Sequence, residues 1–315
     1  MHYGNKNLRI VSQSSATGTQ YLQAVGCAIS RKLDKTKEIV YVSSGEGTTS
    51  QGDFHEALNW AGREKAPVIF HIQDNEYAIS THRSEQTAGS VYSLVSGYEN
   101  LSKYQVDGTD FFETHLAFKQ AVERAKRGKG PSVIVSNVVR LMPHSSSDDQ
   151  RKYRSEKALK KDLERDPILS FKQICIEKDI FSVSDAEKIE AKIKKQIDND
   201  TTWAEQQDHP EKDTALKYIY SEEKVKLESK LTKISDSIVM VDAINHALHE
   251  EMERNDRMVI YGQDIADPKG GVFTATKGLS SKFGKGRVFN SQLAESSIIG
   301  TAVGMAVTGY KPVVE

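Results

Sequence analysis

Polar residues with hard oxygen atoms follow two short β-branched segments of this sequence. Glu46 sits in the Gly-Glu-Gly triplet at 45–47, directly after IVYVSS at 39–44, and Asn75 comes shortly after VIFHI at 68–72. Carboxylate and amide oxygens suit Mg²⁺ or Ca²⁺, and Mg²⁺ usually fills its remaining positions with water and ligand phosphates. The two residues therefore predict a divalent-cation site that also receives a phosphorylated ligand.

The glycine triplet does not fit two common phosphate-binding loops. A dinucleotide fingerprint needs G-x-G-x-x-G, and here the third glycine position falls on Ser50. A nucleoside triphosphate loop ends in Gly-Lys-Ser or Gly-Lys-Thr, which this segment lacks. Taken alone, Glu46 could be an exposed loop acid and Asn75 a turn residue, so the metal site depends on both residues reaching the same place.

A third polar group, Arg140 and His144, follows at the end of the segment SVIVSNVVR at 132–140. Their simpler interpretation is an arginine that ends a strand and a histidine in a surface loop or helix cap. In a parallel sheet, however, ligands bind in the crevice outside the carboxyl ends of the strands. We therefore expect the loops of Glu46, Asn75 and Arg140 to converge on one crevice.

The segments around these residues alternate between strand and helix patterns. Residues 112–127 are an expected helix, and YQVDG before them is a short strand. Another helix is expected earlier in the chain, directly after the glycine triplet. Its apolar residues recur at i, i+3, i+4 and i+7 and would form one buried face: Phe54, Ala57, Leu58 and Ala61. Strands that alternate with helices indicate an α/β fold with a parallel sheet covered on both faces.

The rest of the chain divides into two regions of different character. Residues 151–236 are polar and weakly helical, which predicts a helical extension and connector with solvated charged faces. After it, a second α/β pattern begins with a helix face that includes Ile244 and Met252, followed by the strand MVIYGQD, a glycine-rich loop, and a final helix and strand. We expect an N-terminally incomplete first domain, a connector and a C-terminally incomplete last domain, at 1–150, 151–236 and 237–315.

Composition excludes several classes of protein. The 43 Lys and Arg residues balance 44 Asp and Glu residues, so no overall basic field gathers nucleic acid or an anionic membrane surface. No apolar run approaches the ~18 residues that a membrane helix needs, and the N-terminus lacks a signal-peptide pattern. Cys27 and Cys175 have no metal-ligand spacing, which fits free thiols in a reducing compartment. We expect a cytoplasmic protein without nucleic-acid or membrane partners.

Longer segments resemble one enzyme family. GEGTTSQGDFHEALNWAGREKAPVIFHIQDNEYAIS is similar to the diphosphate-binding motif of thiamine-diphosphate enzymes, with 26 residues between Gly47 and Asp74. YAIST, VDGTD, RLMPHSSSDD and RDPILSF resemble the α subunit of 2-oxo acid dehydrogenase decarboxylating components, closest to the branched-chain (2-oxoisovalerate) type. The segment from YGQDIADPKGG to KPVVE resembles the opening of the β subunit. The α-like segments precede the β-like segment on one polypeptide, which resembles an α subunit fused to a β subunit. This chain would be a fragment of such a fusion.

The resemblance implies a thiamine-diphosphate-binding fold and a role for each matching residue. Glu46 and Asn75 would bind Mg²⁺ through their side chains, and Tyr77 through its backbone carbonyl. Arg140 would pair with the cofactor diphosphate, whose geometry a guanidinium fork matches. His144 would face the reacting end of the cofactor as a proton donor or hydrogen-bonding group.

The glycine loop and the second half of the chain would complete the cofactor site. The resemblance places Gly45, Gly47 and Thr48 beside thiamine diphosphate. Glu295, in QLAES, matches the glutamate that bonds the aminopyrimidine ring and promotes loss of the thiazolium C2 proton; its simpler interpretation is an acid favoured at a helix N-terminus. In the family the two halves of the site usually come from different protomer copies, so we expect Glu295 not to meet Glu46 within one chain.

Two other loops match sites found in some family members. SSATGTQYLQAVG matches a loop near the cofactor and a K⁺ site, which makes Ser15, Thr19 and Gln20 candidates for cofactor or K⁺ binding. Ser145, in PHSSSDDQRKYRS, occupies the position of a phosphorylation site. Short serine-rich loops are usually flexible linkers, and we favour that interpretation. Two positions depart from the family pattern, since the triplet is not Gly-Asp-Gly and Asp74 replaces the first Asn of the usual pair.

The resemblance implies oxidative decarboxylation of a 2-oxo acid with thiamine diphosphate and Mg²⁺. A branched-chain substrate is favoured, with pyruvate as the other candidate, and the acyl group would pass to the lipoyl group of a dihydrolipoamide acyltransferase. We expect a homo-oligomer. Two alternatives stay open: a catalytically incomplete fragment that acts as a binding or assembly module, and a transketolase-type enzyme, against which the β-like segment argues.

Overall fold

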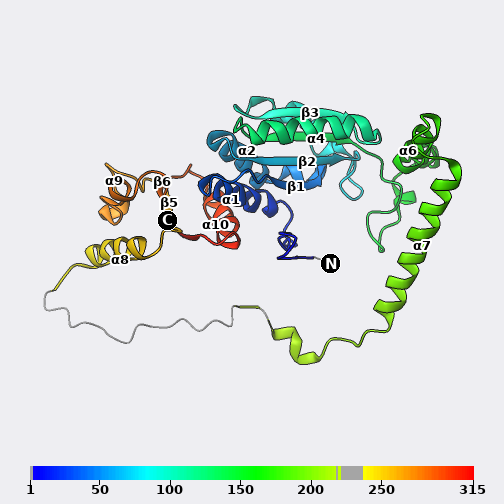
Figure 1. Cartoon of the computed structure of the whole chain (residues 1–315). Helices are drawn as coiled ribbons and strands as arrows, with labels where there is room; N and C mark the ends of the chain where they lie inside the picture. Colours follow the sequence, from blue (N-terminus) through cyan, green and yellow to red (C-terminus); the bar gives the residue numbers. More distant parts are fainter. Residues whose placement is uncertain (1–2, 218, 221–236) are drawn as a thin grey trace. The chain divides into compact units, whose positions relative to one another are not determined.

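The computed structural model describes residues 3–217, 219–220 and 237–315 (Figure 1). The chain forms two compact units, one made of Met1–Ser170 and Val239–Glu315 and the other of Phe171–Ile238. Residue 218 and residues 221–236 of the expected connector lie outside the described residues. The first unit contains both β-sheets.

Four parallel strands form the first sheet, in the order β1-β2-β4-β3. Each strand overlaps a segment predicted from the sequence: β1 Val40–Gly45, β2 Val68–Asp74, β3 Ser102–Asp107 and β4 Ser132–Asn137. The central strands β2 and β4 are buried along most of their length, as expected where helices cover both faces of a parallel sheet. The predicted fold class, α/β with a parallel sheet and flanking helices, is confirmed.

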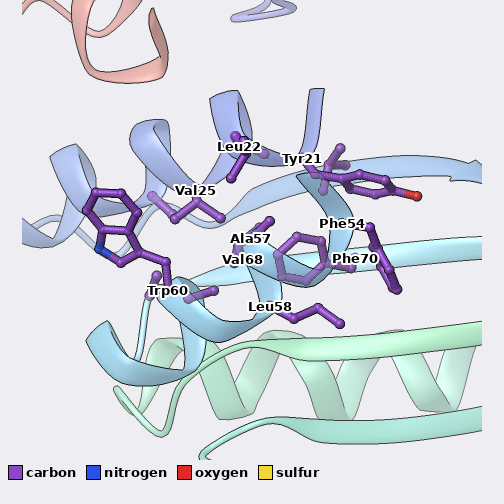
Figure 2. Packing of buried hydrophobic residues seen from close by; sticks show 14 of the residues in the cluster. Tyr21, Leu22, Val25, Phe54, Ala57, Leu58, Trp60, Val68 and Phe70 are labelled. Carbon is purple, nitrogen blue, oxygen red and sulfur yellow. The ribbon is translucent and has the colours of Figure 1, made fainter. Parts of the chain in front are cut away.

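Two helices cover one face of this sheet, α1 Thr19–Leu33 and α2 Gly52–Glu64. Figure 2 shows their apolar side chains gathered against Val68 and Phe70 of β2. The predicted buried face of α2 is confirmed, because none of its four residues is exposed to solvent: Phe54, Ala57, Leu58 and Ala61. This core fixes α2, and with it the loop that connects α2 to β1.

The opposite face of the sheet is covered by α4 Phe111–Lys126. The Asp110 side chain caps this helix by accepting hydrogen bonds from two backbone N–H groups in its first turn. Small residues, Ala117 and Ala121, pack against the strands. A short helix, α3 Val91–Leu94, lies in the irregular stretch between β2 and β3.

Three parallel strands form the second sheet, in the order β6-β5-β7. The strands are β5 Met258–Gly262, β6 Val288–Asn290 and β7 Lys311–Val314. The helices of this part are α8 Met240–Arg254, α9 Leu279–Phe283 and α10 Glu295–Val307. The predicted pattern of helix, strand, loop, helix and strand is therefore confirmed in outline.

The predicted buried face of α8 is only partly correct. Met252 is fully buried, and Leu248 packs beside it. Ile244, which we expected on the same buried face, is 45% exposed. The hydrophobic cluster beside the short sheet includes Leu248 and Met252 but not Ile244, so the buried face of α8 is confined to its C-terminal half.

Glycine residues bring α1 and α10 into close contact within the first unit. A Cβ atom on Gly26 would stand 2.1 Å from the carbonyl oxygen of Thr301, and a Cβ atom on Gly304 would stand 2.0 Å from that of Gln23. The Cys27 thiol donates to the carbonyl oxygen of Gly304 at 3.3 Å. A side chain at either glycine would force the two helices apart, so this contact depends on residues without a Cβ atom.

The polar segment after residue 150 is helical, as its composition predicted. Its helices are α5 Glu156–Leu163, α6 Pro167–Glu177 and α7 Val183–Glu205. A capping box between Ser182 and Asp185 begins α7. Among the described residues, no helix combines the length and apolar character needed to cross a membrane.

Candidate functional site

Three loops meet at the carboxyl edge of the first sheet. Glu46 directly follows β1, Asn75 directly follows β2, and Arg140 lies three residues beyond the end of β4. The loop after β2 lies against the glycine loop, because a Cβ atom on Gly47 would stand only 2.9 Å from the Cβ atom of Ala78. The Arg140 guanidinium donates to the carbonyl oxygen of Ala78 at 3.1 Å. The predicted crevice residues therefore stand on adjacent loops.

Glu46 is the most unusual group at this edge. Its side chain is buried, with a relative exposure of 2%. One carboxylate oxygen, Oε2, accepts a hydrogen bond from the backbone N–H of Asn75 at 3.2 Å, whereas Oε1 has no hydrogen-bond partner among the described residues. Burial raises the pKa of this carboxyl group above its usual value. A buried carboxylate oxygen without a donor is one that a cation can satisfy.

The loop after β2 closes on itself through side-chain oxygens. Asn75 Oδ1 accepts a hydrogen bond from the backbone N–H of Tyr77 at 3.1 Å, and Asp74 Oδ1 accepts one from that of Glu76 at 3.0 Å. The second oxygen of Asp74 forms an ion pair with Arg83 at 2.5 Å. Arg83 therefore compensates the negative charge that Asp74 adds beside Glu46. Nothing in the sequence predicted this role, since Arg83 lies in an irregular stretch without periodicity.

Arg140 holds the loop after β2 in place. Its guanidinium donates to the carbonyl oxygens of Ala78 and Ile79 and to the hydroxyl of Tyr153, at 3.1, 3.0 and 2.7 Å. The guanidinium carbon lies 5.8 Å from the centre of the Tyr77 ring. Its Nε atom is buried without a hydrogen-bond partner among the described residues. One donor of this fork is thus left for a further acceptor.

His144 and Ser145 lie on an exposed loop. The backbone N–H of His144 donates to Asp148 at 2.9 Å, and the same carboxylate accepts a hydrogen bond from Tyr153 at 2.7 Å. The hydroxyl groups of Ser145 and Ser147 are 3.1 Å apart. These contacts connect the loop to Arg140 through Tyr153.

The segment before α1 lies beside the glycine loop. Gly45 ends β1, and Thr48 lies in the 3₁₀ turn Glu46–Ser50. Gly18, at φ 97°, lies near this turn, because a Cβ atom built on Gly18 would stand 3.9 Å from Thr48 Cγ2. Gln20 accepts a hydrogen bond from the backbone N–H of Gly18 at 3.1 Å. The Gln20 side chain is therefore held near the glycine loop.

The two remaining candidates in that segment precede or begin α1. Thr19 donates its hydroxyl hydrogen to the carbonyl oxygen of Ala16 at 2.9 Å and lies 2.6 Å from the Ser14 hydroxyl. Ser15 is exposed. These polar groups precede the buried part of α1.

Glu295 begins α10 and is exposed, with one carboxylate oxygen accepting a hydrogen bond from Gln263 at 3.2 Å. Its helix packs against α1 and α2 of the same chain. Glu56 of α2 accepts hydrogen bonds from the backbone N–H and hydroxyl of Ser297, at 2.9 and 2.7 Å. The sequence did not predict a role for Glu56, because its partner is 241 positions away.

The residues at this edge fit Mg²⁺ and a diphosphate. Glu46 offers a buried oxygen that has no donor in the described part of the chain, and Asn75, whose backbone N–H contacts Glu46, carries an amide oxygen on the adjoining loop. Carboxylate and amide oxygens are the hard ligands that Mg²⁺ prefers. Gly47 keeps the backbone free of side-chain bulk where the two loops meet. The Arg140 guanidinium supplies positive charge on the neighbouring loop.

Two protein-family models match successive parts of the chain. The model described as dehydrogenase E1 component matches residues 1–213. The model described as transketolase, pyrimidine binding domain, matches residues 236–315. The first match contains the glycine loop and both crevice loops, and the second contains α10 and Glu295.

Curated relatives with similar sequences are α subunits of dehydrogenases. The 2-oxoisovalerate dehydrogenase subunit alpha of Bacillus subtilis is 36% identical over 221 residues, which cover 70% of this chain and 67% of that protein. The pyruvate dehydrogenase E1 component subunit alpha of the same organism is 33% identical over 192 residues, 61% of this chain and 52% of that protein. A pyruvate dehydrogenase E1 component subunit alpha of Staphylococcus aureus is 35% identical over 178 residues, 56% of this chain and 48% of that protein.

The chain thus spans about half to two thirds of the length of the relatives it matches. The family match nevertheless covers more than half of the chain and includes all three loops at the carboxyl edge of the first sheet. The chain therefore belongs to the family of dehydrogenase E1 components.

Proposed function

We propose that the chain is part of a thiamine-diphosphate-dependent 2-oxo acid dehydrogenase component in which α-type and β-type segments are fused. The observation that carries this proposal is the buried Glu46 oxygen, for which the described residues supply no donor, on the loop between β1 and α2 and beside the loop of Asn75. The succession of the two family matches along one chain supports the fusion.

The proposed Mg²⁺ ligands are the side chains of Glu46 and Asn75 and the backbone carbonyl of Tyr77. For Asn75 this requires its Oδ1 to share or give up the hydrogen bond from the Tyr77 N–H group. Arg140 would bind the diphosphate as well as the loop after β2. The cofactor-binding surface would also include Gly45, Gly47, Thr48, Ser15 and Gln20, and the segment before α1 could hold K⁺.

Two residues are proposed to act on protons. Glu295, at the exposed first turn of α10, would accept and return a proton at the aminopyrimidine ring. His144, on the loop tied to Arg140 through Tyr153, would donate a hydrogen bond or a proton to the reacting substrate. When bound, the cofactor supplies the electron sink that the loss of CO₂ from a 2-oxo acid requires.

The proposed substrate is a branched-chain 2-oxo acid, with pyruvate as the second candidate. Relatives named for both substrates have 33–36% identity, and the branched-chain relative has the longer match. The proposed acyl acceptor is the lipoyl group of a dihydrolipoamide acyltransferase. We propose a homo-oligomer that works in the cytoplasm.

A thermal-shift and decarboxylation series on the 315-residue chain tests this proposal. Thiamine diphosphate with Mg²⁺ should raise the melting temperature, because a ligand stabilises the state that binds it. CO₂ release from branched-chain 2-oxo acids should then exceed release from pyruvate. Stabilisation without decarboxylation would favour the binding-module alternative, and absence of stabilisation would contradict the proposed site.

A further inference from the structure

We infer that Glu56 of α2 is a positioning residue for Glu295, because it holds the first turn of the helix that carries Glu295. The inference rests on the proposed function, in which Glu295 meets the aminopyrimidine ring. Glu56 is none of the metal or cofactor ligands proposed above. It acts through the backbone of α10.

The carboxylate of Glu56 caps α10 from a different helix. Its Oε2 accepts hydrogen bonds from the backbone N–H of Ser297 at 2.9 Å and from the Ser297 hydroxyl at 2.7 Å. Ser297 is fully buried. The N-cap residue of α10, Ala294, has no side-chain cap of its own. Glu56 therefore satisfies a helix N-terminus that the local sequence leaves without a capping group.

Gln292 ties the same turn to α2 a second time. Its side-chain amide donates to the backbone carbonyl of Glu56 at 3.3 Å and to the Ser297 hydroxyl at 3.1 Å. Its Oε1 accepts a hydrogen bond from Asn59 at 3.1 Å. Because Gln292 and Ser297 stand on either side of Glu295 in the sequence, both attachments constrain the turn where Glu295 lies.

This arrangement connects the two ends of the proposed site through one rigid element. α2 follows directly after the turn that carries Glu46, and one helical turn later it presents Glu56 to α10. A carboxylate at a helix N-terminus forms charge-assisted hydrogen bonds and interacts favourably with the helix dipole. The contact between α2 and α10 therefore constrains the turn of Glu295, in addition to the close packing of α10 on α1.

Hydrogen exchange in the metal-free chain tests the cap directly. Glu56→Gln keeps the size of the side chain but removes its charge. We expect the amide of Ser297 and its first-turn neighbours to exchange at least ~10-fold faster than in the parent, since hydrogen bonds to charged groups are the stronger ones. Glu64→Gln, on the same helix but paired with Lys32 and Arg63, is the matched control and should leave this exchange unchanged.

Parent-like exchange of Ser297 in Glu56→Gln would overturn the inference, whether or not the chain binds a cofactor. The proposed function is tested separately by the parent chain. If the parent fails to bind thiamine diphosphate with Mg²⁺, the proposed function is refuted, and hydrogen exchange still decides whether Glu56 holds α10.

The double variant Glu56→Gln with Ala294→Ser tests whether Glu56 positions Glu295 or only caps α10. A serine at the N-cap can cap α10 locally, so the double variant should recover parent-like first-turn exchange while its tie to α2 stays broken. In the cofactor-loaded chain we expect affinity within ~3-fold of the parent but C2 proton exchange slower by ~10-fold or more, because small misplacements of reacting groups are costly. C2 exchange as fast as in the parent would mean that Glu56 merely stabilises the helix, and would overturn its positioning role.

Discussion

The burial of the Glu46 carboxylate destabilises the folded, metal-free chain. Burial raises its pKa, and one of its oxygens has no hydrogen-bond partner among the described residues. A buried charge is unfavourable unless an opposite charge or hydrogen bonds compensate it. Backbone hydrogen bonds and the charge of Arg83 compensate this burial only in part, and Arg83 is itself paired with the neighbouring Asp74. A bound divalent cation would compensate the charge of Glu46, so that the buried carboxylate would stabilise the folded chain instead of destabilising it.

Replacing Glu46 by Gln should therefore stabilise the metal-free chain while it removes the metal site. Gln keeps the acceptor for the Asn75 N–H group but carries no charge. We expect a melting temperature about 2–4 °C above that of the parent without metal, which corresponds to roughly 1 kcal/mol in a domain of this size. Glu123→Gln, an exposed change on α4, is the control and should leave the melting temperature within ~1 °C. A lower melting temperature in Glu46→Gln would contradict the account of Glu46 as a strained ligand.

A buried histidine gives the first sheet a dependence on pH. His71 on β2 lies between the hydroxyl groups of Tyr41 and Ser136, each 2.9 Å from a ring nitrogen. Burial lowers the pKa of His71 below its usual 6.5. The folded chain therefore binds this proton less readily than the unfolded chain. The stability contribution is fully present above pH ~6.5 and is lost as the pH falls through and below that value.

His71→Gln should flatten this loss of stability at acidic pH. Urea unfolding followed through Trp60, in a Trp203→Phe background, reports on the core of the first unit. Between pH 7 and 5, the urea midpoint of the parent should fall more steeply than that of His71→Gln. His115→Gln, an exposed change on α4, should behave as the parent does. Equal slopes in all three proteins would exclude His71 as the source.

At the residue scale, the sequence predicted where polar groups would gather better than how they are paired. Glu46 and Asn75 could be placed together because strand ends converge in a parallel sheet. Arg83 and Glu56 could not be predicted, because their partners depend on the path of an irregular loop and on a contact across 241 positions. Pairing of this kind becomes visible only when the elements are packed.

At the scale of elements, the contact between α1 and α10 is one that the periodicity of apolar residues does not predict. The strands and the buried face of α2 follow from alternating or helical apolar spacing. The close contact of α1 with α10 follows instead from glycines, whose absent side chains allow one backbone to approach another. A scan for apolar residues cannot detect such a surface, and for α8 the same scan predicted more burial than the structure shows.

Filling this contact should destabilise the first unit. In Gly304→Ala the new Cβ atom would stand 2.0 Å from the Gln23 carbonyl oxygen, and in Gly26→Ala it would stand 2.1 Å from that of Thr301. Overpacking of this kind costs about 1–3 kcal/mol, so each variant should melt several degrees below the parent. Gly97→Ala is the control, because its Cβ atom meets no atom within 4 Å. Variants that melt like the control would show that the helices do not pack this closely.

At the scale of the whole molecule, the two halves of the proposed site lie in one compact unit of one chain. We expected Glu295 not to meet Glu46 within one chain, because in the family that the sequence resembles the two halves of the site usually come from different protomer copies. The structure places α10 against α1 and α2 of the same chain, but the hydrogen-bond partner of Glu295 is Gln263 and not a residue of the Glu46 loop, so this expectation stays a prediction. The sequence could order the two segments but could not show which copy they pack against, because that depends on matching surfaces.

The most direct test of the central claim is calorimetric titration of the chain with thiamine diphosphate, with Mg²⁺ and then with a chelator. Mg²⁺ should tighten cofactor binding at least ~10-fold, because Glu46 and Asn75 would hold the metal that neutralises the diphosphate in the proposed site. Glu46→Ala and Asn75→Ala should each abolish that difference, while Gly97→Ala keeps it. An affinity that is the same with Mg²⁺ and with chelator, or that both alanine variants retain in full, would contradict the assignment of this loop as a metal and diphosphate site.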